Sequence, residues 1–491
     1  MEQKKITFSN ARVQLLSGAT LAMFQLLSVV ILARLLSPVD FGLAAAASIV
    51  TNIALFISEF GLGAALVQRT ELNDKLISTA LLISLIMYGA LGSLVYFVAE
   101  LMATYNSSEE LGRVIKLLII PFVFTGLACI PKGLLLRDFQ YKKLMFVNVF
   151  SYFVGMLIVP IILASYGFGV WSIVWGQIVL SVLTFSISLY YSKMKLAVSF
   201  GREYVGDLLR FGFGVTLVRL FDVLVCEGDK LILGHTMNIS SLGIFERLSK
   251  ISLMLSGHLG FFFDSLLFPS FSRLQSDHEK FKEAYLKSVD VAVVTGCLIS
   301  AVTPLFSSEI ILLILGEGWL DYTKVLMLLL VLPGVRLVTR VGDVAMRALS
   351  KLYLNSCIKI VAAILTLICI YYFSEFGLRL VAVTYIAVGL LIVVITHLAI
   401  SFILQVGFSA LILLMIKRIL SVLVIIGPIW VLVLNCDFGF YGSLMVKLSY
   451  LLLVGVVVFI FEGFFGESFR QVLIPLKGRL LFRMKSGGTA S

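Results

Sequence analysis

The segment from Lys324 to Leu349 reads KVLMLLLVLPGVRLVTRVGDVAMRAL and is the most informative part of the sequence. It is long and apolar enough to cross a bilayer, yet it carries Arg336, Arg340, Asp343 and Arg347. Steps of four, three and four residues put these side chains, the charged stripe, on one face of a helix. An arginine near the bilayer centre costs roughly 2.5–3.5 kcal/mol, while each Leu, Ile, Val or Phe contributes only about 0.3–0.6 kcal/mol. We therefore expect the stripe to face other helices or a water-filled cavity, where it favours an anionic ligand.

The whole chain has the composition of a protein that crosses a membrane many times. Of its 491 residues, 60% are hydrophobic and 14% are charged, and the mean hydropathy is +1.06. Long, continuous apolar runs exclude a soluble domain of any size and an outer-membrane barrel. We predict an all-α polytopic membrane protein with about fourteen transmembrane helices. The predicted spans lie at roughly 11–35, 41–66, 76–102, 113–135, 144–164, 170–192, 208–234, 242–268, 289–313, 324–349, 355–373, 380–404, 413–434 and 443–463.

The positive charge of the chain indicates its topology. The net charge is +11, and most Lys and Arg residues between the predicted spans, such as Lys142, Lys280 and Lys351, fall on one side of the membrane. The positive-inside rule places that side, and with it both termini, in the cytoplasm. Nucleic acid is therefore not an expected partner.

An internal duplication organises the chain. Asp40-Phe41-Gly42-Leu43 enters the second span as Ser241-Leu242-Gly243-Ile244 enters the eighth, about 200 residues later. Six spans separate the two units, so both have the same orientation, and two parallel repeats around a central cavity are a common transporter architecture. The expected parts are an N-terminal lobe at 1–207, a C-terminal lobe at 208–405, and two extra spans with a basic cytoplasmic tail at 406–491.

Charged side chains inside the spans are the candidate functional residues. Arginine keeps its charge when buried and binds phosphate through two hydrogen bonds, so a cationic stripe favours a phosphate or pyrophosphate head group. The candidates for binding it are Arg336, Arg340, Arg347, Arg219 and Lys250. Buried carboxylates can exchange protons during transport. The candidates for ion coupling are Asp222, Glu227, Asp229, Asp264, Asp343 and Glu59.

The alternative is that these charges neutralise one another and hold helices together. The pairs at helical spacing are Arg219 with Asp222, Glu246 with Lys250, and Asp343 with Arg340 or Arg347. Pairing inside the stripe leaves it net positive, because it has three arginines and one aspartate. Both interpretations stay open for each individual residue.

No pattern predicts a cofactor, a metal or catalysis. The histidines are scattered without ligand spacing, and no GxxxxGK phosphate loop is present. The loops between the spans are too short for a catalytic domain. We therefore expect a transporter and not an enzyme.

Several short motifs carry a resemblance to a known family. They are LSPVDFG at 36–42, EFGLGAALVQR at 59–69, GDKLILG at 228–234, FPSFSRLQ at 268–275 and LGEGW at 315–319. In this order they resemble bacterial polysaccharide flippases of the Wzx type, especially the WzxC-like branch of the multidrug/oligosaccharidyl-lipid/polysaccharide superfamily. The similarity runs from Ser9 to beyond Leu404. The chain departs from the family at 242–246, where LGIFE stands in place of a Tyr followed by a small residue.

The resemblance implies twelve or fourteen helices in two lobes around a central cavity. It implies a cargo of undecaprenyl-diphosphate-linked oligosaccharide, moved across the bacterial inner membrane for the synthesis of lipopolysaccharide or exopolysaccharide. Alternating access coupled to a proton or sodium gradient, as in an antiporter, is the expected mechanism. The expected partners are the lipid-linked oligosaccharide, membrane lipid, a polysaccharide polymerase and a chain-length regulator.

Three other functions are the alternatives. A lipid II flippase shares the diphosphate-lipid cargo, and only the motifs above separate it from the favoured function. A drug exporter of the same superfamily requires an acidic, aromatic cavity, which the surplus arginines disfavour. A membrane polysaccharide polymerase is an enzyme and requires a sizeable periplasmic loop, whereas every predicted periplasmic loop is short.

Overall fold

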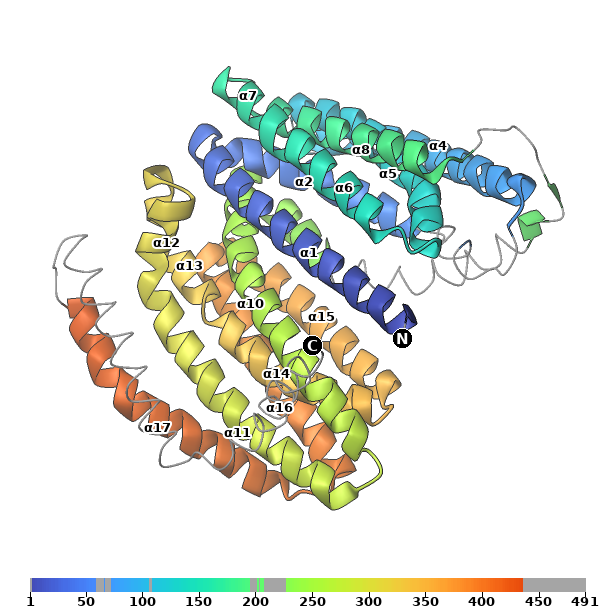
Figure 1. The fold of residues 1–491 in the computed structure, drawn as a ribbon. Helices are drawn as coiled ribbons and strands as arrows, with labels where there is room; N and C mark the ends of the chain where they lie inside the picture. Colours follow the sequence, from blue (N-terminus) through green and yellow to red (C-terminus); the bar gives the residue numbers. More distant parts are fainter. Residues whose placement is uncertain are drawn as a thin grey trace, which may run out of the picture. The chain divides into compact units, whose positions relative to one another are not determined.

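The computed structural model describes residues 2–58, 66, 72–105, 108–194, 201–202, 204–206 and 227–435. This part of the chain consists of helices and contains no β-strand, which confirms the all-α class (Figure 1). The elements, where η marks 3₁₀ and π turns, are α1 (Glu2–Leu35), α2 (Pro38–Ser58), α4 (Asp74–Tyr105), α5 (Glu109–Arg137), α6 (Tyr141–Tyr152), η1 (Phe153–Ile158), α7 (Val159–Ser165), α8 (Val170–Ser192), α10 (Ile239–Leu274), α11 (His278–Val302), η2 (Thr303–Phe306), α12 (Ser307–Ile314), η3 (Glu317–Tyr322), α13 (Thr323–Leu329), α14 (Leu332–Ala348), α15 (Leu352–Phe373), η4 (Ser374–Phe376), α16 (Leu378–Ile403) and α17 (Phe408–Asn435).

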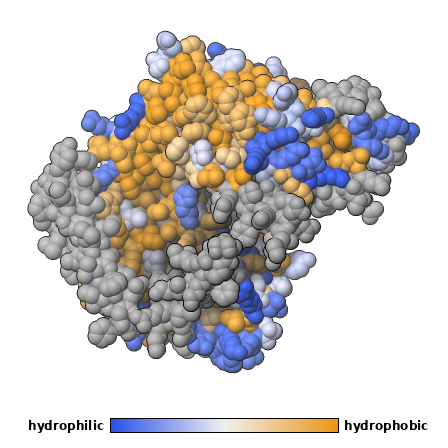
Figure 2. Space-filling model, in the orientation of Figure 1, coloured by the Kyte–Doolittle hydropathy of each residue, from blue (hydrophilic) through white to orange (hydrophobic). Residues whose placement is uncertain are grey.

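Eleven helical segments among the described residues are long and apolar enough to cross a membrane. They coincide with predicted spans one to six and eight to twelve. α17 covers the thirteenth predicted span, whereas the fourteenth and most of the seventh lie outside the described residues. Figure 2 shows mostly apolar residues on the described surface in that view, as expected for helices that contact lipid. The chain is a multi-pass membrane protein, and the total of fourteen spans stays a prediction.

Contacts along the chain divide it into two units. The first contains Met1–Arg247 and Leu313–Gly318, and the second contains Leu248–Leu312 and Trp319–Ser491. α10 therefore starts in the first unit and continues in the second. The lobes expected at 1–207 and 208–405, with the extra spans at 406–491, stay a prediction.

The start of α2 explains the first motif of the sequence in structural terms. The Asp40 carboxylate accepts hydrogen bonds from the Ser37 amide (2.9 Å) and hydroxyl (2.7 Å), and the Asp40 amide donates to Ser37 Oγ (3.2 Å). This reciprocal capping box satisfies amides that a helix start leaves without partners. The second oxygen of Asp40 accepts the Val170 amide (2.9 Å) and so fixes the start of α8. Two positions of the motif thus stabilise the first unit.

A proline reshapes the fifth predicted span. Pro160 has no amide hydrogen, so the carbonyl of Met156 lacks the donor that a regular α-helix would supply four residues later. The helix widens there into the π turn η1, and the Ser28 hydroxyl of α1 donates to Met156 O over 2.7 Å. A carbonyl at membrane depth needs such a donor. The predicted single helix at roughly 144–164 is therefore α6, η1 and α7 in the structure.

The core of the second unit lies among α10, α11, α14 and α16. Buried residues such as Phe271, Val338 and Ile400 pack together there. One polar contact crosses this core: the Tyr285 hydroxyl of α11 lies 2.6 Å from Nδ1 of His397 on α16, and both side chains are buried. The core holds α14, which carries the charged stripe, between its neighbours.

Candidate functional site

α14 begins at a break in the tenth predicted span. The sequence predicts one helix at roughly 324–349, whereas the structure has α13, a two-residue turn and α14. Pro333 removes the amide donor of Leu329 O. Three hydroxyls of neighbouring elements donate to successive carbonyls at the break, Ser252 to Leu329 O (2.7 Å), Thr303 to Leu330 O (2.9 Å) and Ser300 to Val331 O (2.8 Å). These bonds satisfy irregular backbone at membrane depth and fix where α14 starts.

Two glycines let α14 cross α11 at close range. A Cβ atom added to Gly296 of α11 would lie 2.6 Å from the carbonyl oxygen of Gly334 on α14. A Cβ atom added to Gly334 would lie even closer to the carbonyl oxygen of Gly296. Small residues at helix crossings allow backbones in membranes to approach in this way. The crossing sets the position of α14 within the second unit.

One face of α14 is less buried than the others and carries the three arginines of the charged stripe, whereas Asp343 is buried. Thirteen of its 17 residues are buried, and the remaining four are Arg336, Thr339, Arg340 and Arg347. These residues follow one another at helical spacing, so α14 presents its arginines along a single face. The side chains of Arg340 and Arg347 are 41% and 36% exposed, respectively. Two guanidinium groups are therefore held by packed backbone while remaining accessible.

A single carboxylate on α10 binds two of these arginines. Arg340 donates from Nε and Nη2 to the two oxygens of Asp264, over 3.0 and 2.7 Å. Arg347 donates from Nη2 to Asp264 Oδ1 over 3.0 Å, and its guanidinium lies 5.9 Å from the ring centre of Phe268. Gly260 leaves room for Arg340, because an added Cβ would lie 3.4 Å from the guanidinium carbon. One negative charge offsets only one of the two positive charges, so this cluster of three side chains is net cationic.

Asp343 is held by a residue of another helix. Its carboxylate lies 3.3 Å from the ammonium group of Lys359 on α15. From its helical spacing, Asp343 was an alternative partner of Arg340 or Arg347 within the same helix. In the structure both arginines bind Asp264 on α10 instead. Contacts between helices therefore decide the pairing here, since Lys359 lies on α15 and Asp264 lies on α10.

The other candidate residues divide into described and undescribed ones. In the first unit the buried Glu227 accepts from Asn52 Nδ2 (3.3 Å) and from the Lys230 ammonium (3.0 Å), and Asp229 accepts the Lys230 amide (2.8 Å). Lys250 lies on α10 in the second unit. Arg219, Asp222 and Glu59 lie outside the described residues. Of the eleven candidates, the described contacts join Arg340, Arg347 and Asp264 in one cluster.

Several charged residues inside the predicted spans are missing from the sequence candidates. Two examples are Lys359, the partner of Asp343, which lies inside the predicted eleventh span, and Lys132, which lies inside the fourth. A lysine within an apolar run is a signal that could have identified both. In the part of the chain that the structure describes, no three His, Cys, Asp or Glu side chains gather as metal ligands.

Comparisons with known proteins agree with this picture. The family model described as polysaccharide biosynthesis protein matches residues 31–324. The succinoglycan biosynthesis transport protein ExoT of Rhizobium meliloti is 27% identical over 320 residues, which cover 63% of this chain and 62% of that protein. The lipopolysaccharide biosynthesis protein WzxC of Escherichia coli is 22% identical over 347 residues, 68% of each chain. The matched part spans somewhat less than two thirds of the length of the first of these relatives.

A solved structure shares the fold. The lipid II flippase MurJ in an inward closed conformation superimposes with a TM-score of 0.71 over 95% of this chain and 100% of that one, at 15% sequence identity. At this identity the likeness concerns the arrangement of helices and not the cargo.

Proposed function

The chain belongs to the polysaccharide biosynthesis protein family, and on that premise we propose that it is a flippase for oligosaccharides linked to a polyprenyl diphosphate. It moves these units from the cytoplasmic to the periplasmic leaflet of the bacterial inner membrane, with both termini in the cytoplasm. The names of the relatives, one a succinoglycan transport protein and one a lipopolysaccharide biosynthesis protein, support a surface glycan as the cargo. The fold shared with a lipid flippase supports transport and not catalysis.

The observation that carries this proposal is the sharing of one carboxylate by two arginines. Arg340 and Arg347 both bind Asp264, so their cluster has one positive charge that Asp264 does not offset. A diphosphate brings several anionic oxygens and matches the planar forks of two guanidinium groups. Arg336, one turn before Arg340 on the same face, extends the site along α14. In this proposal the diphosphate binds the stripe and the glycan occupies the hydrated space beside it.

Release of Asp264 gives a route to ion coupling. When a diphosphate takes the guanidinium groups of Arg340 and Arg347, the Asp264 carboxylate loses the three hydrogen bonds that it accepts from them. A partly buried carboxylate without a counter-ion binds a proton or a sodium ion more readily. Cargo binding and ion binding then use the same residues, and the ion leaves when the arginines return to Asp264.

The test is the removal of two arginines in the intact cell. The double variant Arg336→Ala/Arg340→Ala is expected to abolish surface polysaccharide and to accumulate lipid-linked oligosaccharide on the cytoplasmic side. Immunoblotting of membranes checks that the protein is present at the normal level. The matched control is Arg418→Ala, because Arg418 also forms a forked ion pair within the second unit, with Asp290, but lies on α17.

The outcomes separate the proposed function from its alternatives. Normal polymer from the double variant, at normal protein level, refutes the phosphate site. Polymer of reduced chain length without accumulated intermediate supports a polymerase. Loss of polymer in the Arg418→Ala control, again at normal protein level, shows that the effect is not specific to the stripe.

A further inference from the structure

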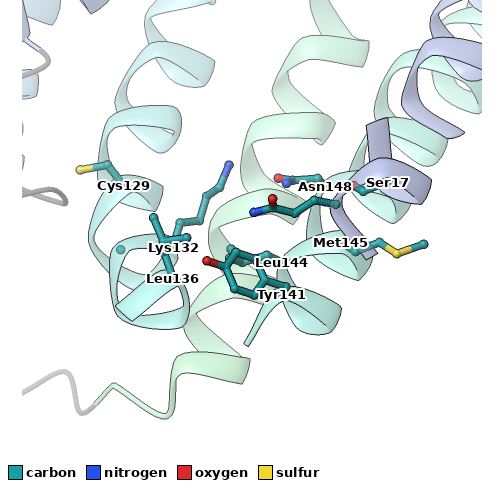
Figure 3. A pocket seen from close by; sticks show the side chains of 10 residues that line it. Ser17, Cys129, Lys132, Leu136, Tyr141, Leu144, Met145 and Asn148 are labelled. Atoms are coloured by element: carbon teal, nitrogen blue, oxygen red, sulfur yellow. The ribbon is translucent and has the colours of Figure 1, made fainter. Parts of the chain in front are cut away.

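The first unit contains a pocket that shares no lining residue with the stripe on α14. It has a volume of about 430 Å³ and lies between α1, α5 and α6 (Figure 3). This volume is within the range of about 300–1,000 Å³ that small-molecule sites occupy. Apolar and polar side chains line it together, among them Leu136, Met145, Gln14, Ser17, Asn148 and Lys132. A pocket of this size and lining suits a small ligand that carries polar groups.

Lys132 is the one cation among the described residues that line the pocket. It lies in α5, five residues before the helix ends at Arg137, and its side chain is partly buried. No carboxylate of the described chain comes within ion-pair distance of its ammonium group. Keeping an ammonium group out of bulk water is costly unless an anion or several hydrogen-bond acceptors surround it. The pocket therefore presents a positive charge that its own residues do not neutralise.

The direction of the Lys132 side chain argues against a simpler role. Lysines near the ends of membrane helices commonly run along the surface so that the charge reaches the lipid head groups. Lys132 instead extends from α5 toward the space that Asn148 of α6 and Ser17 of α1 border (Figure 3). Three separate helices thus contribute polar groups to one cavity, and the charge lies among them.

The polar groups of the pocket define the chemistry of its ligand. Gln14 and Asn148 each offer an amide that donates and accepts hydrogen bonds, and Ser17 offers a hydroxyl that does the same. Such mixed groups match the hydroxyls of a sugar. Lys132 is a compact point charge that pairs with a single oxyanion, whereas a diphosphate is better matched by the forks of arginines. A sugar that carries one oxyanion satisfies both parts of the pocket.

We propose that this pocket is a second binding site, specific for an oxyanion carried on a sugar, in which Lys132 pairs with the oxyanion and the side chains of Gln14, Ser17 and Asn148 bind the neighbouring hydroxyls. The pocket lies at the turn between α5 and α6, the end of the helices that the predicted topology places toward the cytoplasm, where the cargo is made. That the sugar belongs to the transported glycan rests on the proposed function. Binding of the oxyanion itself does not.

The test is calorimetric titration of the purified full-length protein in lipid nanodiscs with glucuronate, glucose and pyrophosphate. Glucuronate is expected to bind the wild type at least about tenfold more tightly than glucose, which lacks the charge. Lys132→Met is expected to weaken glucuronate binding at least about tenfold. The matched control is Lys142→Met, an exposed lysine at the same end of the helices, which is expected to change it less than about twofold. Asn148→Ala is a second pocket variant, expected to weaken binding without changing the charge.

The pyrophosphate titration identifies the source of the oxyanion. Pyrophosphate binding that is lost in Arg340→Ala and retained in Lys132→Met supports a sugar carboxylate as the ligand of the pocket. Pyrophosphate that binds more tightly than glucuronate and depends on Lys132 overturns the sugar and assigns the pocket to the diphosphate. Absence of glucuronate binding, or binding that neither pocket variant weakens, overturns the site altogether. Glucuronate binding that depends on Lys132 stands even if the arginine double variant makes normal polymer, so the two proposals fail separately.

Discussion

Replacing Asp264 by Asn distinguishes a binding site from a structural ion pair. The substitution keeps the size of the side chain and removes its charge. Asp264 accepts three hydrogen bonds from Arg340 and Arg347. An asparagine has one oxygen, and its amide hydrogens face further donors on the guanidinium groups, so at least one of the three bonds is lost.

The expected magnitudes follow from the exposure of the cluster. A hydrogen bond to a charged group contributes about 1.5–3 kcal/mol when buried, and exposed ion pairs contribute about 0–1 kcal/mol. The side chains of Arg340, Arg347 and Asp264 are 41%, 36% and 22% exposed, so we expect a loss of stability of about 2 kcal/mol in total. The affinity for pyrophosphate is expected to rise about tenfold, because the anion no longer competes with a carboxylate for the arginines.

The assay combines thermal unfolding with calorimetric titration of pyrophosphate. Asp290→Asn is the matched control, because Asp290 also accepts a forked pair of hydrogen bonds, from Arg418 Nε (2.5 Å) and Nη2 (2.8 Å). The control is expected to lose similar stability and to bind pyrophosphate like the wild type. An Asp264→Asn protein that is less stable but binds pyrophosphate no better than the wild type contradicts an anion site, since the arginines then act as helix contacts only.

Three further predictions concern packing and capping, and each is measured by chemical or thermal unfolding. Gly296→Ala forces a methyl group against α14 and is expected to lower the free energy of unfolding by about 1–3 kcal/mol. The control is Gly257→Ala on α10, where an added Cβ meets nothing within 4 Å. This control is expected to be neutral or to stabilise the protein by up to about 1 kcal/mol. Equal stability of the two variants contradicts the close crossing. Ser37→Ala removes the capping box of α2 and is expected to cost about 1 kcal/mol, and an unchanged unfolding midpoint contradicts this role. Tyr285→Phe removes the buried contact with His397 and is expected to cost about 1–3 kcal/mol; wild-type stability in this variant shows that the contact contributes nothing.

The sequence predicted the shared face of the three arginines because helical periodicity is a local property, whereas Asp343 of the stripe is buried. The spacing of Arg336, Arg340 and Arg347 places them on one face of any helix, and the structure has a helix there. Pairing between helices is not local. Asp264 lies 76 residues before Arg340 in the chain, and the sequence contains no signal for which of many carboxylates meets it.

Prolines mark in the sequence where a helix lacks an amide donor, but they do not identify the residue that replaces it. Pro160 and Pro333 both interrupt predicted spans, and a missing amide donor at each is certain from the residue type alone. The hydroxyls that satisfy the freed carbonyls come from Ser28 and Ser252, on other helices. Their positions follow from tertiary packing, so the sequence indicates that a break needs a donor and not which residue supplies it.

The junction between α13 and α14 also determines where the arginines lie. Its three carbonyls are held by the hydroxyls of Ser252, Ser300 and Thr303, which belong to α10, α11 and η2. The start of α14 is therefore tied to three neighbouring elements at once, and the register of the charged residues along the helix is set from its first turn. The charge pattern of the stripe thus depends on three uncharged residues that lie outside it.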